Sequence, residues 1–173
     1  TLVINHLDPQ WALKQCTVVQ NTIAAGREDI DCCLATDEVS TIVDRSNRKV
    51  IDSLDICQTR NRPENALAAN GYKFDRIKYF PLGPDTNPYN QGLDWAVLTA
   101  QICSNRPIIS VKRWDEGGNH SEVITGFQEN PDASVDVDTH QLDGFYNESF
   151  QDYRGIPGVS THVRDYINIR SGR

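Results

Sequence analysis

Four residues in the order Gln, Cys, His, Asp could together form the site of a cysteine hydrolase. Cys16 is the expected nucleophile, Gln10 stands six positions before it, and His120 and Asp138 follow far downstream. A thiol nucleophile needs surroundings that keep it as a thiolate, a general base, and donors for the oxyanion that develops during attack. This order of residue types therefore predicts acyl transfer through a thioester.

Cys16 opens a stretch with helical periodicity. Apolar side chains at Cys16, Val19 and Ile23 fall on one face before a glycine ends the run, as in a short amphipathic helix. A thiol at a helix N-terminus is stabilised as a thiolate by unpaired N–H groups and the helix dipole. The Gln10 amide is the expected side-chain donor to the oxyanion. The alternative is that Cys16 is a core residue and Gln10 an ordinary surface side chain.

His120 is the expected general base, because a glycine-rich loop delivers it to the start of an apolar strand. Its imidazole needs a partner that fixes the tautomer. If the hairpin turn is centred on Glu129, Asp138 lies opposite His120, and Asp136 lies diagonally on the same face. A register shifted by one residue would bring Thr139 there instead. The alternative is an ordinary histidine at a strand end beside a solvated acidic strand.

Helices are expected before strands along the chain. Helices are expected over Cys16–Gly26, Glu38–Asp44, Pro63–Asn70 and Asp94–Ile102, and strands over Ile108–Val111, His120–Phe127, Ser134–Asp138 and His162–Ile169. The turn-rich segment Leu82–Asn90 predicts a linker. This order indicates an α+β fold with segregated elements. We expect one domain over residues 1–173, with a helical lobe over about residues 1–80 and a β-rich lobe over about residues 105–173.

Charge and hydropathy exclude several partners. The chain carries 17 Lys and Arg against 24 Asp and Glu, a net charge of −7, and has no basic patch. Nucleic acid is therefore not an expected partner. No apolar run has the length of a membrane span. The sequence contains no Met, so we expect a processed form from which any targeting segment has been removed.

The cysteine count is odd, with residues Cys16, Cys32, Cys33, Cys57 and Cys103. An odd thiol beside one or two disulfides is typical of an exported protein with a reactive cysteine, which predicts a secreted or extracytoplasmic location. Five reduced thiols in a cytosolic protein are the alternative.

Neither zinc nor calcium is expected. There is no Cys-x-x-Cys spacing for a structural zinc site. The alternating Asp136, Asp138 and His140 are not a calcium loop, because Gln141 stands where that loop requires glycine. We expect no metal and no other cofactor.

The spacing of Gln10 and Cys16, followed by a distant Gly-Gly-Asn-His, resembles the papain-like cysteine peptidases. The likeness is to compact bacterial members similar to bacteriocin-leader peptidases and secreted effector proteases. Arg106–Val111, His120–Phe127 and Val135–Asp138 add to it. The resemblance implies a helical lobe packed against an antiparallel β-sheet lobe, with a cleft between them that binds a peptide or protein substrate.

The resemblance assigns a role to each residue of the site. Cys16 would be the nucleophile, His120 the base, Gln10 the oxyanion donor and Asp138 the group that orients the base. One position beside the site departs from the family pattern, since Thr139 stands where proline is expected.

The resemblance also bears on the disulfides and on the nucleophile segment. It implies a bond between Cys32 or Cys33 and Cys57. Thr17-Val18 follows the nucleophile where tryptophan and alanine are usual. Three other functions remain open: a transglutaminase-type acyltransferase, a non-catalytic papain-like binding or toxin-associated domain, and a disulfide-stapled interaction domain.

Overall fold

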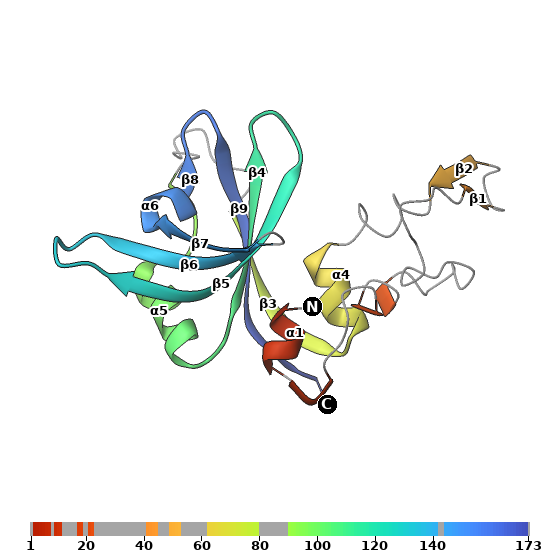
Figure 1. Ribbon diagram of the computed structural model, residues 1–173, viewed down its shortest axis with the longest axis horizontal. Coiled ribbons are helices and arrows are strands. Elements are labelled where there is room, and N and C mark those ends of the chain that lie inside the picture. The colour runs from red at the N-terminus through yellow and green to blue at the C-terminus, as the bar shows by residue number, and fades with distance from the viewer. Residues whose placement is uncertain are drawn as a thin grey trace. The chain divides into compact units, whose positions relative to one another are not determined.

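The computed structural model describes residues 2–7, 9–11, 17–18, 21–22, 41–44, 49–52, 62–79, 90–141 and 144–172. The chain divides into two compact units (Figure 1). The first unit is Thr1–Tyr72 with Ser171–Arg173, and the second is Lys73–Arg170. Helices together with a mostly antiparallel sheet confirm the predicted α+β class.

The first unit contains the helices α1 (Leu2–Leu7), η1 (Pro9–Trp11) and α4 (Pro63–Ala69), and the strands β1 (Thr41–Asp44) and β2 (Lys49–Asp52). The sequence signals of α4 are confirmed, because Pro63 begins the helix and Asn70 caps its end. Asn70 also accepts a hydrogen bond from Asn21 Nδ2 at 2.7 Å. Thr17, Val18, Asn21 and Thr22 are helical, as expected, whereas Cys16 lies outside the described residues.

The helix predicted over Glu38–Asp44 is wrong over its second half. Thr41–Asp44 is the strand β1, which pairs antiparallel with β2 from Thr41 opposite Asp52 to Asp44 opposite Lys49. Three of its four residues are β-branched, and such side chains lose rotamer freedom in a helix but pack well on a pleated surface.

The second unit is built on a seven-stranded sheet (Figure 1). Its elements are β3 (Tyr72–Lys78), α5 (Trp95–Cys103), β4 (Ile108–Trp114), β5 (Asn119–Glu129), β6 (Val135–Gln141), β7 (Gly144–Ser149), α6 (Phe150–Tyr153), β8 (Gly155–Ile156) and β9 (Ser160–Ser171). The strand order is β3-β9-β4-β5-β6-β7, with β8 paired to β9. The four predicted strands are present, and each is longer than expected.

The core of this unit lies between the sheet and α5. Its buried members are Leu93, Leu98, Ile108, Ile124, Val137, Tyr153 and Ile167. We call the sheet face that carries Ile108, Ile124 and Val137 the core face. Trp95 of α5 closes one side of the core with edge-on contacts to Phe127 at 5.4 Å and Phe150 at 5.0 Å. Aromatic edges and apolar side chains therefore fill one end of the core face.

The hairpin of β5 and β6 has a different register from the predicted one. The N–H of Asn130 donates to the carbonyl of Ser134 at 2.9 Å, and Asp132 accepts bonds from the N–H and hydroxyl of Ser134. The turn is thus centred three residues later than Glu129. An irregularity between Ile124 and Gly126 then changes the pairing by one residue, back toward the predicted register.

Candidate functional site

The predicted site residues are divided between the two units, and one of them lies outside the described residues. Gln10 is exposed on η1 in the first unit, and Cys16 lies outside the described residues. His120 is half-buried near the start of β5, and Asp138 lies on β6, both in the second unit. Cys103 is an exposed free thiol, while the other three cysteines predicted to form disulfides lie outside the described residues.

Asp138 does not lie opposite His120, so the predicted pairing is wrong. Asp138 pairs with Gly126 on one side and with Asn147 on the other. Gly126 is six residues along β5 from His120, which at about 3.4 Å per residue places the two roughly 20 Å apart. No aspartate side chain spans that distance, and Asp138 therefore does not orient the His120 imidazole.

The Asp138 carboxylate instead holds its own hairpin. Its Oδ1 accepts a hydrogen bond from Asn147 Nδ2 at 3.1 Å. Its Oδ2 lies over Gly126, where a Cβ atom would collide with it. The second choice, Asp136, pairs with Gln128 still farther from His120, and the third, Thr139, pairs with Ile124.

His120 has different neighbours from those the sequence predicted. It lies directly across from Lys112 of β4, and its ring centroid is 5.9 Å from that of Trp114. Residues directly opposite in an antiparallel pair share a face, as do residues two apart on one strand. Lys112, Glu122 and Trp114 are therefore on the same face of the sheet as His120.

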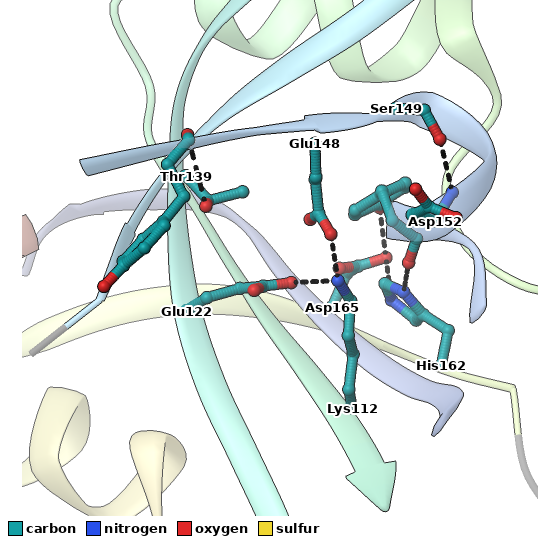
Figure 2. Close-up of polar contacts among 10 residues, drawn as sticks. Lys112, Glu122, Thr139, Glu148, Ser149, Asp152, His162 and Asp165 are labelled. Atoms are coloured by element: carbon teal, nitrogen blue, oxygen red, sulfur yellow. Dashed lines mark hydrogen bonds and ion pairs between the residues drawn. The ribbon is translucent and has the colours of Figure 1, made fainter. Parts of the chain in front are cut away.

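A buried group of three charges lies beside this histidine. Lys112 Nζ is 2.9 Å from Glu122 Oε1 and 2.6 Å from Glu148 Oε2. Figure 2 shows the ammonium between the two carboxylates. Lys112 is 4% exposed and Glu122 2%, and the Glu148 side chain is 18% exposed. Contacts within the group therefore largely replace contacts of these side chains with water. We call these three residues the charge cluster.

The surroundings of Glu148 favour its protonated form. Burial raises the pKa of its carboxyl to about 7, and the Glu122 carboxylate raises it too, while the Lys112 ammonium opposes both effects. The free-energy cost of removing a carboxylate from water exceeds the attraction that it gains from an ammonium shared with a second carboxylate. The charge cluster therefore binds a proton near neutral pH.

A second buried polar group adjoins the charge cluster on β9. Asp165 Oδ2 accepts hydrogen bonds from the hydroxyls of Tyr79 at 2.8 Å and Tyr153 at 2.9 Å. Burial, followed by the negative Asp165, raises the pKa of both tyrosines. Both hydroxyls therefore remain donors to Asp165. We call Tyr79, Tyr153, His162 and Asp165 the tyrosine cluster.

His162 is fully buried and holds a fixed tautomer. Its Nδ1 lies 2.7 Å from the carbonyl oxygen of Tyr153, and a carbonyl only accepts, so Nδ1 carries a proton. Its Nε2 is 3.0 Å from Asp165 Oδ2. Figure 2 shows this ring beside Asp165 and next to Lys112 of the charge cluster. Neither residue has any exposed surface, so this pair has no access for a substrate.

The sequence contained a signal for the charge cluster that the prediction did not use. Ile108, Ser110 and Lys112 alternate on one face of β4, and His120, Glu122 and Ile124 alternate on the facing strand. Lys112 and Glu122 thus follow the same every-second-residue spacing as the buried Ile108 and Ile124, which places both charged residues at core positions. Glu148 had no comparable signal, because β7 was not predicted.

Comparison with protein-family models, with curated protein sequences and with solved structures finds no match. Within the described ranges, no group of three or more His, Cys, Asp or Glu side chains could hold a metal ion. No helix in the part of the chain that the structure describes is long and apolar enough to cross a membrane.

Proposed function

We propose that the chain is a cysteine peptidase with a papain-like arrangement of Cys16, His120 and Gln10. The observation that carries the proposal is the position of His120, half-buried at the start of β5 directly after the Gly117-Gly118 loop. Both glycines have positive φ angles, +105° and +87°, which a glycine adopts without strain. This position supports the proposal, because the glycine loop leads directly into the strand that carries His120.

The other three histidines are less suited to act as the base. His162 is fully buried with its Nδ1 against a carbonyl. His140 packs against Phe145 with ring centroids 3.8 Å apart, and His6 lies exposed on α1. His120 combines partial exposure with the required place in the chain order.

The proposed reaction is hydrolysis by acyl transfer. His120 takes the thiol proton of Cys16, and the thiolate attacks the peptide carbonyl, forming a C–S bond. Gln10 and the backbone N–H of Cys16 or Thr17 donate to the oxyanion. His120 then gives the proton to the leaving amine as the C–N bond breaks, and water hydrolyses the thioester. A peptide or protein is the substrate, and a secreted or extracytoplasmic location is part of the proposal.

Asp138 has no part in this proposal. The site is proposed as a Cys16–His120 dyad, in which the Trp114 ring packs against the imidazole. Packing limits the rotation of the ring but provides no charge, so any electrostatic support must come from another residue.

Acylation by p-nitrophenyl acetate tests the proposal without knowledge of the natural substrate. We expect a burst of one equivalent of nitrophenol, with acetyl on Cys16 by peptide mass mapping, that Cys16→Ala abolishes. Gln10→Ala should slow this acylation by roughly 10²–10³-fold, the scale of one oxyanion donor. Cys103, an exposed free thiol, is the reference within the same sample. Acetylation of Cys16 no faster than that of Cys103 would reject the proposal.

A second function is favoured by one observation. The separation of Asp138 from His120 along β5 and β6 removes the third member that the family pattern supplies, which favours a non-catalytic papain-like binding domain. That domain predicts an unreactive Cys16, so the same acylation experiment decides between the two functions.

A further inference from the structure

We infer that the charge cluster supplies the negative charge beside His120 that Asp138 does not supply, and that proton uptake by Glu148 removes this charge as the pH falls. Glu148 and Glu122 are thus positioning residues for His120, acting through Lys112. The catalytic consequence rests on the proposed function, whereas the coupling between Glu148 and His120 rests on the geometry of the second unit alone.

The sheet register places the cluster next to His120. Lys112 is directly across from His120, where Cβ atoms of an antiparallel pair lie about 4.5–5.5 Å apart. Glu122 is two residues from His120 on the same strand and the same face. His162 of β9 is opposite Lys112 on its other side. Lys112 therefore lies in a row between two histidines.

The net charge of the cluster depends on one proton. With both carboxylates ionised, one ammonium and two carboxylates sum to −1, and with Glu148 protonated they sum to zero. A neighbouring negative charge favours an imidazolium, which is the partner that a thiolate nucleophile needs. An isolated Lys112 would have the opposite effect. The two glutamates convert an unfavourable cation beside His120 into a favourable anionic group.

Glu148 is the member that takes up the proton. It is less buried than Glu122, and its pKa of about 7 lies within the physiological range. The charged groups that face it are Lys112 on β4 and Glu122 on β5. His162 and Asp165 of β9 lie next to Lys112, and Asp152 of α6 donates its N–H to Ser149, the residue after Glu148 (Figure 2). Lys112 is shared with Glu122, so it cannot hold Glu148 fully ionised.

NMR of the whole chain tests the coupling without reference to catalysis. The carboxyl carbon of Glu148 should titrate near pH 7, and the His120 ring signals should show an inflection at that same pH. Glu148→Gln should remove this inflection. Glu129→Gln, the same chemical change at an exposed position of β5, should leave it in place. The wild-type titration alone suffices if the Glu148 variant does not fold.

Alkylation of Cys16 by iodoacetamide tests the catalytic consequence. Glu148→Gln should lower the rate at pH 8 by about two- to tenfold, the effect of removing one nearby charge at a high effective dielectric. Absence of the His120 inflection, or its survival in Glu148→Gln, would overturn the inference. If the inflection is present but wild-type Cys16 reacts no faster than Cys103, the coupling stands and the peptidase proposal fails.

Discussion

Glu148 shows, at the scale of a single residue, how burial and neighbouring charge set a chemical property. Its carboxyl is half-buried against Lys112 and Glu122, and its pKa rises from 4.5 to about 7 on folding. The folded state therefore binds a proton more tightly than the unfolded chain does. This contribution to stability is fully present below about pH 4.5 and is lost as the pH rises through about 7.

The free energy of unfolding should therefore fall with pH in a way that depends on Glu148. Between pH 5 and pH 8 we expect the wild type to lose roughly 2–3 kcal/mol relative to Glu148→Gln, the amount that a shift of this size implies. Urea unfolding at the two pH values measures this difference. Glu129→Gln should follow the wild type, and a Glu148→Gln profile parallel to the wild type would contradict the expected proton uptake.

Sequence reasoning at this scale predicted that His120 lies at the start of a strand, but it did not predict the neighbours of His120. The glycine loop and the apolar strand mark the start of β5, so a residue at that point is predictable. Lys112 and Glu122 were missed because charged residues are rarely placed at core positions without a known partner. The partner, Glu148, is 36 residues from Lys112, and no local pattern connects them.

At the scale of elements, the register of β5 and β6 decides which residues can act together. Gly126 and Asp138 pair directly, and the Asp138 carboxylate occupies the space above the glycine. If the turn were centred on Glu129, Gly126 would lie opposite Asp132, and His120 opposite Asp138. The Gly126–Asp138 contact is therefore the clearest signature of the observed register.

A double-mutant cycle tests this register. Gly126→Ala should destabilise the protein by about 1–3 kcal/mol, because its Cβ collides with the Asp138 carboxylate. Asp138→Ala in the same chain should recover part of that loss, with an interaction energy of about 0.5–3 kcal/mol by urea unfolding. Additive effects of the two substitutions would instead support the register in which Asp138 faces His120.

The helix α4 and the strands β4, β5, β6 and β9 were predictable because each carries a local signal: proline at a helix start, or β-branched and alternating apolar residues. The strands β3 and β7 lack a clean alternation of apolar residues, and long-range pairing positions them. The hairpin register could not be predicted from the sequence. Asn130, Asp132 and Ser134 form the turn through side-chain hydrogen bonds, and the irregularity at Ile124 has no sequence signal.

At the scale of the whole molecule, the proposed peptidase activity names residues that belong to different units. Gln10 and Cys16 belong to the first unit and His120 to the second. The α+β class followed from the order of helices and strands, which local patterns record. A pairing of nucleophile and base has no such local record, because the two proposed residues are about a hundred positions apart in the sequence.

The most direct test of the proposed function is the rate of Cys16 alkylation by iodoacetamide as a function of pH, in the wild type and in His120→Ala. Peptide mass mapping separates Cys16 from Cys103, and His6→Ala is the control for loss of a histidine from an exposed position. We predict a rate already high near about pH 5–6 that collapses only in His120→Ala, as for a thiolate activated by an imidazolium. A rate that rises only near the free-thiol pKa of about 8.5, unchanged by His120→Ala, would contradict the proposed function and leave a binding domain without catalysis.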